Sequence, residues 1–190
     1  MKFTPKNFAA KIFVALILFT SFQVSAADNS ERIRELKEIY SLQGHEEGGD
    51  FAEVYTSPVK KSRRPIAGSI YFLLVGRDVS HFHQLDCDEL WMYHEGCGLK
   101  IFVLHDGKVD EILLGTDVEK SARHMAIIPA GSIFAAENLD ADGYTLVSCV
   151  TAPQFTYKGF RLVERRKLKK LYPKLDEKIL RLAYEKSLTE

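Results

Sequence analysis

Two histidines and a glutamate in the middle of the chain have residue types and a spacing that could do chemistry. His81 and His83 are separated by one residue in a short run typical of a strand, and Glu89 begins the next such run. Alternate residues of a strand face the same side, so both imidazoles are expected to project together. With Glu89 facing them from a neighbouring strand, the three groups could hold a borderline divalent metal or act in proton transfer.

Aromatic side chains are expected around these groups. Trp91 and Tyr93 follow Glu89 at alternate positions, which places all three on one face of the predicted strand. Polar groups that converge between flat apolar surfaces are the usual composition of a small-molecule site. The ligand-binding residues that we predict are Glu47, Tyr71, His83, Glu89, Trp91, Tyr93 and Phe134.

His83 and Glu89 are the predicted catalytic residues. A partly buried carboxyl beside an imidazole can titrate near neutral pH and transfer a proton. A competing interpretation is a buried pair whose polar groups satisfy each other and fix the core. A third interpretation is a metal site made by His81, His83 and Glu89. The residues alone leave all three open.

Glu47 precedes two glycines, Gly48 and Gly49. Glycine permits backbone angles that are closed to other residues, so the chain can turn sharply and bring Glu47 over the mouth of the predicted hollow. The alternative is a plain turn between a helix and a strand, with solvated carboxylates at Glu46 and Glu47.

Short runs rich in Val, Ile, Leu, Phe and Tyr fill the centre of the chain and predict the strands that position these residues. About nine strands with no intervening helix fit an all-β jelly-roll barrel. One helix is expected before them, at 31–42, and two after them, at 161–171 and 175–188, separated by Pro173. The predicted strands are 51–56, 69–74, 79–84, 89–94, 100–105, 109–114, 124–128, 133–137 and 144–151.

Residues 81–96 resemble the first motif of the cupin superfamily, in which H-x-H is followed by a glutamate and later by a glycine. Five residues separate His83 from Glu89, where the motif usually has three or four. Residues 129–138 resemble the second motif, P-x-G-x-x-H-x-x-x-N, but Phe134 stands where that motif has a histidine ligand. The resemblance implies a cupin-type barrel that has lost one of its usual metal ligands.

An ordered set of motifs resembles one uncharacterised branch of that superfamily more closely. Its members share H-P-E-G-G, an S-I-Y-F-L-L-like strand, S-x-x-H-x-x-x-x-D-E-x-W, P-A-G-x-W and S-C-x-x-A-P-G-F. The matching segments are 45–49, 69–74, 80–91, 129–134 and 148–155. The departures are Glu46 for proline, Asp50 for an aromatic residue, Phe134 for tryptophan and Gln154 for glycine. The resemblance implies a homodimer and no agreed reaction.

Three functions follow from these patterns. The leading hypothesis is an exported cupin that binds a small polar or carbohydrate-like molecule, with metal-independent isomerase or epimerase chemistry by analogy. The alternative is a metal-dependent oxygenase or isomerase that uses His81, His83 and Glu89, with His45 or Glu47 as a replacement ligand. The branch usually has no histidine at position 81, so the cofactor stays unknown and a divalent metal is the less favoured choice. The third hypothesis is a non-catalytic ligand-binding or sensor module.

The composition of the chain limits which classes of protein and which partners are possible. The chain has 190 residues, 26 Lys+Arg, 26 Asp+Glu and 46% hydrophobic residues, which describes an ordinary globular domain and excludes collagen-like, disordered and multi-spanning membrane proteins. The basic C-terminal region has no recognition motif, so we expect no nucleic-acid partner. Three cysteines are not a disulfide scaffold and leave at least one thiol free, although a pair between Cys97 and Cys149 stays open.

The first 26 residues have the pattern of a secretory signal peptide. Three lysines precede an apolar run at 12–22, and small residues end at Ala26. An eleven-residue helix rising about 1.5 Å per residue covers only about half of a hydrocarbon core of about 30 Å. We therefore expect cleavage near Ala26 and a periplasmic or extracellular product with no membrane contact. The remaining 27–190 is expected to be a single cupin domain, with a helical extension at 161–190.

Export predicts a mature chain that begins at Ala27. Amino-terminal sequencing of the protein recovered from its natural host should find this residue first, because signal peptidase cleaves after a small side chain. Recovery of an exported chain that still begins at Met1 would contradict the prediction.

Overall fold

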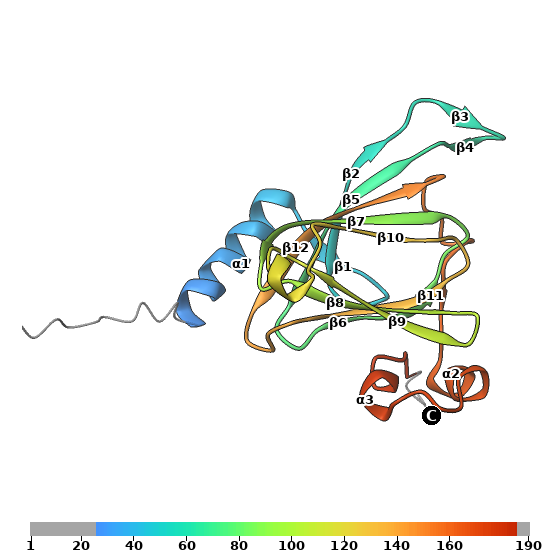
Figure 1. Ribbon diagram of the computed structural model, residues 1–190. Helices are drawn as coiled ribbons and strands as arrows, with labels where there is room; N and C mark the ends of the chain where they lie inside the picture. The colour runs from blue at the N-terminus through green and yellow to red at the C-terminus, as the bar shows by residue number, and fades with distance from the viewer. Residues whose placement is uncertain (1–25, 186–190) are drawn as a thin grey trace, which may run out of the picture.

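The computed structural model describes residues 26–185, in which two antiparallel sheets pack face to face (Figure 1). In spatial order, the larger sheet contains β1 (Gln43–Gly44), β2 (Asp50–Thr56), β5 (Gly68–Val75), β12 (Tyr144–Ala152), β7 (Asp88–Gly96) and β10 (Met125–Ile128). The smaller sheet contains β13 (Arg161–Leu162), β6 (Val79–Gln84), β11 (Ile133–Asn138), β8 (Leu99–His105) and β9 (Lys108–Leu114). A projecting hairpin is formed by β3 (Lys60–Lys61) and β4 (Arg64–Pro65). The predicted all-β jelly roll is confirmed.

The apolar core between the two sheets holds the site in place. Phe72 and Trp91 from the larger sheet meet Ile101 and Phe134 from the smaller sheet, and all four side chains are buried. Full burial of a large apolar side chain contributes about 1.5–3 kcal/mol. The strands that carry the polar groups are therefore fixed by packing on both sides of those groups.

Helix α1 (Ala26–Tyr40) lies on the outer face of the larger sheet. Leu36 is buried there against Leu73 and Leu146, and the Tyr40 ring lies 4.3 Å from the Tyr71 ring, centroid to centroid. The helix begins before the predicted 31 and ends before the predicted 42.

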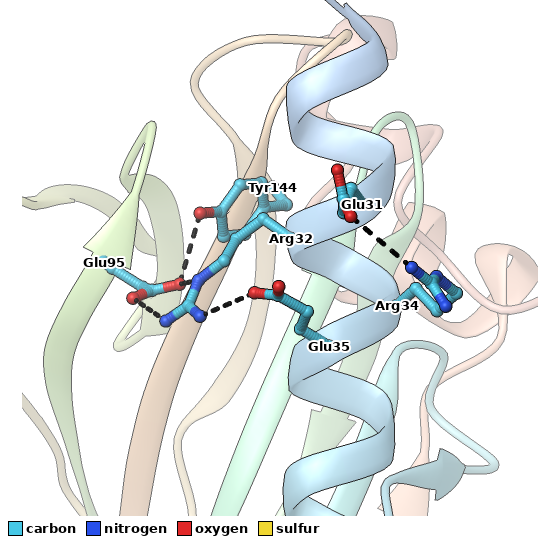
Figure 2. Close-up of polar contacts among 6 residues, drawn as sticks. All are labelled: Glu31, Arg32, Arg34, Glu35, Glu95 and Tyr144. Atoms are coloured by element: carbon cyan, nitrogen blue, oxygen red, sulfur yellow. Dashed lines mark hydrogen bonds and ion pairs between the residues drawn. The ribbon is translucent and has the colours of Figure 1, made fainter.

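A charged pair joins α1 to the sheet, as Figure 2 shows. Arg32 donates from Nε to Oε1 of Glu95 and from Nη2 to Oε2, at 2.9 Å each, and the Tyr144 hydroxyl donates to Oε1 at 3.2 Å. The Arg32 guanidinium lowers the pKa of Glu95. Because the pair is partly exposed, its contribution to stability is modest, but its fork geometry fixes the direction of the helix.

The C-terminal extension is less helical than predicted. Residues 161–162 form β13, helix α2 covers Arg165–Leu171, and α3 covers only Glu177–Leu180. Val163, Leu168, Leu180 and Leu182 pack with the outer face of the smaller sheet, so tertiary burial decided the path of this segment. A helix over 175–188 is therefore wrong for the described residues, and 186–188 lie outside them.

The three cysteines are free, with Cys87 and Cys149 buried and Cys97 partly exposed. Within the described part of the chain, no helix is both long and apolar enough to cross a membrane. Apart from Ala26, the predicted signal peptide lies outside the described residues.

The turn before β2 depends on two glycines with positive φ angles. Gly48 has φ +100° and Gly49 has φ +71°. A Cβ added at Gly48 would lie 2.1 Å from the carbonyl oxygen of Val79, and one at Gly49 would lie 2.7 Å from the Phe72 ring. The backbone N–H of His81 donates to the carbonyl of Glu47 at 2.7 Å. This hydrogen bond joins the turn to β6, and the Glu47 side chain points inward.

Gly48→Ala should lower the free energy of unfolding by about 1–3 kcal/mol, because the new methyl group meets a strained φ and a backbone oxygen. Gly107→Ala is the matched control, since Gly107 has φ +74° with no atom within 4 Å of an added Cβ. Urea unfolding of both variants separates the clash from the φ strain. Equal losses in the two variants would contradict the proposed close approach.

Candidate functional site

A hollow opens between four strands of the larger sheet, β2, β5, β12 and β7, and the segment that follows β12. Its volume is about 670 Å³ with the open mouth counted, and the centre of a water molecule can reach about 60 Å³ of it. The walls include Phe51 from β2, Phe72 from β5, and Phe155 and Tyr157 from the segment after β12. The enclosed part therefore suits a small ligand with a flat apolar surface.

Glu47 is one of two buried carboxyl groups that line this hollow. The Ser80 hydroxyl donates to its Oε1 at 2.9 Å. Its Oε2 lies 3.4 Å from Nε2 of His83 and 3.5 Å from Nδ1 of His45. Burial raises the pKa of Glu47 to about 7, although the charge of His45 and the Ser80 hydrogen bond lower it.

Glu89, at the start of β7, is the second buried carboxyl group. Burial and then the charge of Glu47 raise its pKa to about 7, while His83 acts in the opposite direction. Trp91 and Cys149 lie beside this carboxyl, and both lower its pKa to a smaller extent. Even so, Oε2 of Glu89 and Nε1 of Trp91 are buried without a hydrogen-bond partner among the described residues. An unpaired buried acceptor beside a hollow is a place where a ligand can donate a hydrogen bond.

His83 supports Glu47 from behind and does not line the hollow. Its Nδ1 lies 2.7 Å from the carbonyl oxygen of His81, so Nδ1 carries the proton in the neutral ring. Burial lowers the pKa of His83, which keeps the imidazole neutral at neutral pH. Nε2 is then an acceptor that faces Oε2 of Glu47.

These contacts assign different roles to the two carboxyl groups. Glu47 accepts a hydrogen bond from Ser80, and Ser80 and His45 both favour its ionised form. The charge of Glu47 raises the pKa of Glu89, so Glu89 is the group that retains its proton. Two coupled carboxyl groups titrate as a pair, so near neutral pH they retain one proton between them.

A β-bulge in β6 separates the two histidines. Phe134 of β11 pairs with His83 and Ala136 pairs with Ser80, so two residues of β6 oppose one residue of β11 between these pairs. Ser80 and His83 consequently both face inward. His81 lies against the C-terminal segment, with Nδ1 3.1 Å from the carbonyl oxygen of Leu182. The expectation that His81 and His83 share a face is therefore corrected.

The predicted aromatic residues have three different positions. Phe134 and Trp91 are buried behind the hollow, with the Phe134 ring 4.1 Å from the His83 ring. Tyr71 lies on the outer face of β5, because that strand turns its neighbour Phe72 inward. Tyr93 lies further along β7, where its hydroxyl donates to the carbonyl of Gly96 at 2.7 Å. The structure thus brings together Glu47, His83 and Glu89, while Tyr71 and Tyr93 lie apart from them.

Sequence reasoning missed Ser80 and the aromatic wall of the hollow. Nothing in the sequence marks the bulge that turns Ser80 inward. Phe155 and Tyr157 follow β12 in a segment with no strand pattern. His45, considered only as a replacement metal ligand, lines the hollow with its ring 4.8 Å from that of Phe51. Its position two residues before Glu47 was the available signal.

Comparison with known proteins gives one family. The sequence profile described as "Cupin superfamily (DUF985)" matches residues 34–163. A crystal structure of a protein from Shewanella oneidensis is 32% identical, covers 80% of this chain and 97% of its own, and has a TM-score of 0.76. A hypothetical protein from Leishmania major is also 32% identical, covers 80% and 98%, and has a TM-score of 0.74.

A more distant structure shows the fold alone. A cupin 2 domain-containing protein from Halorhodospira halophila is 12% identical, covers 76% of this chain and 89% of its own, and has a TM-score of 0.50. No curated protein matches the chain.

The side chains do not fit the metal site that the cupin resemblance implies. Phe134 offers no donor atom in place of the histidine ligand, and Nδ1 of His81 is engaged by Leu182. Among residues 26–185, no group of three or more His, Cys, Asp or Glu side chains is arranged to hold a metal ion. The arrangement can instead bind a ligand and transfer protons through Glu47 and Glu89.

Glu89→Gln should stabilise the protein in a pH-dependent way. The pKa of Glu89 is about 7 in the folded chain against an ordinary value of 4.5. The unfolded chain therefore loses this proton first, and the buried charge lowers stability as the pH rises from about 4.5 to about 7. We expect the variant to exceed the wild type in free energy of unfolding by about 2 kcal/mol near pH 8, with little excess near pH 4.

Urea unfolding at the two pH values measures this difference. Glu46→Gln is the matched control, because it makes the same chemical change at the exposed neighbour of Glu47 and should leave the pH dependence unaltered. A Glu89→Gln effect of equal size at both pH values would show that Glu89 does not carry a raised pKa.

Proposed function

The chain belongs to the cupin superfamily, in the family described as DUF985, and we propose that it binds a small polar or carbohydrate-like molecule in the hollow and transfers protons on it as a metal-independent isomerase or epimerase. One observation carries this proposal. Two buried carboxyl groups with pKa values of about 7 face the same hollow, and one of them has an unpaired oxygen. Perturbed carboxyl groups of this kind, in a cleft, are typical of acid–base sites.

The assigned protonation states support one sequence of proton transfers. The Glu47 carboxylate, held by Ser80, takes a proton from a carbon beside the ligand's carbonyl group, and the carbonyl oxygen takes up the developing charge. Glu89, which retains its proton, donates it to that oxygen or to the opposite face of the carbon. One proton leaves the ligand and one is returned, so the reaction needs no oxidant.

The aromatic wall supports a sugar-sized ligand. Phe51, Phe155 and Tyr157 offer flat surfaces to the apolar faces of a ring, while Thr151 and Gln154 offer hydrogen-bonding groups to hydroxyls. The small reachable volume limits water around the carboxyl groups, which strengthens their electrostatic effect on the ligand.

Two further parts of the proposal concern the whole protein. Export is supported by the signal-like pattern that ends at Ala26, and it disfavours nucleotide sugars as ligands. Assembly as a homodimer is supported by the family resemblance.

A binding module without catalysis is the second candidate, favoured by the position of His81. This residue joins Glu47, through its backbone N–H, to Leu182 of the C-terminal segment, through its ring. A ligand that displaces Glu47 would therefore disturb the contact that holds the C-terminal segment.

Glucose, mannose and fructose in deuterated water test the proposal. The wild type should incorporate deuterium at the carbon beside the carbonyl group of at least one sugar, because Glu89 exchanges its proton with solvent. Glu89→Gln should slow this exchange by about 100-fold or more, while Glu46→Gln should leave it unchanged. NMR of the sugars measures the exchange, and saturation transfer from the protein measures binding.

The outcomes separate the candidates. Binding without exchange would reject the isomerase and support the binding module. Exchange that survives in Glu89→Gln would reject the role assigned to Glu89, and absence of both binding and exchange would contradict the proposed function.

A further inference from the structure

Carboxyl groups outnumber the basic side chains around the hollow, where His45 is the one basic residue among the described residues that line it. Three glutamates line it, with Glu47 and Glu89 buried and Glu53 exposed at the mouth. No lysine or arginine is among the described residues that line it. A ligand with a carboxylate or phosphate would therefore meet repulsion with no cation to offset it.

Arg64 on β4 contacts a residue of the hollow, but its guanidinium is already engaged. Arg64 donates from both terminal nitrogens to Asp86, at 3.0 and 2.9 Å, and from Nε to the carbonyl oxygen of Gln154 at 2.6 Å. Gln154 lines the hollow, so Arg64 approaches it from outside. Its guanidinium already donates to these partners, so it offers no free pair of N–H donors to an anionic ligand.

Aromatic rings form the other part of the boundary. The Phe155 and Tyr157 rings lie 5.2 Å apart, and both pack beside His45, whose ring lies next to Phe51. Aromatic faces carry partial negative charge and attract ammonium groups, more strongly where water is excluded. Aromatic walls therefore add to the preference for a positively charged ligand that the carboxyl groups create.

The unpaired Oε2 of Glu89 is the independent sign of a missing hydrogen-bond donor. Glu89 is only 7% exposed, lines the hollow and has no partner for this atom among the described residues. An ammonium group supplies both a donor and the opposite charge, whereas a hydroxyl supplies only a donor.

We propose that the hollow selects a small ligand that carries an ammonium group, such as an amino sugar, over neutral and anionic molecules of the same shape. This inference rests on the proposed function and names the ligand class of the same site.

A consequence is that binding should release protons. An ammonium group beside the carboxyl pair favours their ionised forms and lowers both pKa values, so protons leave as the ligand enters. The titratable and polar groups that face the pair are His45 from the turn, Glu53 from β2, Ser80 and His83 from β6, and Cys149 from β12. None of these groups is a lysine or arginine that would cancel the effect.

Three sugars that differ only at carbon 6 test the inference. The probes are 6-amino-6-deoxyglucose, glucose and glucuronate, which are cationic, neutral and anionic near pH 7.5. Isothermal titration calorimetry with the full protein should show the amino sugar binding about tenfold or more tightly than glucose, with glucuronate weakest. Titration in two buffers of different ionisation enthalpy should show proton release for the amino sugar only.

Variants connect the selectivity to the site. Glu89→Gln should remove most of the preference for the amino sugar, and Glu46→Gln should retain it, because Glu46 is exposed beside the turn. Equal binding of glucose and the amino sugar, tighter binding of glucuronate, or no binding by any of the three would each overturn the inference. If glucose binds and exchanges deuterium with no preference for the amino sugar, the proposed function stands and the ligand class alone fails.

Discussion

Two buried carboxyl groups line one small hollow, and this electrostatic constraint governs the structure around them. An isolated buried carboxylate is costly, so it must find partners or keep its proton. Glu47 has a hydroxyl donor at Ser80 and a neutral imidazole at His83. Glu89 has an unpaired oxygen, and the charge of Glu47 adds to the effect of burial on its pKa. The pair therefore retains a proton that it can exchange with a ligand.

The backbone around this pair is arranged to keep it buried. Gly48 allows the turn to approach Val79, and the bulge in β6 turns both Ser80 and His83 toward Glu47. Phe134 has two effects: it offers no metal-binding atom, and its ring covers His83, whose pKa burial lowers. Phe134 therefore removes a metal-binding atom and contributes to the burial that keeps the imidazole neutral.

The sequence predicted the fold class well, because alternating apolar runs and turn residues depend on local chemistry. It also placed Glu47, His83 and Glu89 near one hollow. Sequence reasoning failed where a single residue changes which side of the sheet a side chain faces. The bulge at His81 depends on pairing with β11. The outward position of Tyr71 depends on its contacts with α1. The short α3 had the same cause, since its segment follows the apolar surface of the smaller sheet and not its own helical pattern.

Carbon-13 titration of the glutamate side chains measures the shared proton most directly. With labelled Cδ atoms, and with Glu47→Gln and Glu89→Gln to assign the signals, the account predicts two carboxyl groups that titrate near pH 7. Removal of Glu47 should lower the pKa of Glu89, because the charge of its neighbour is gone. Titration of every glutamate near the ordinary value of 4.5 would contradict the account.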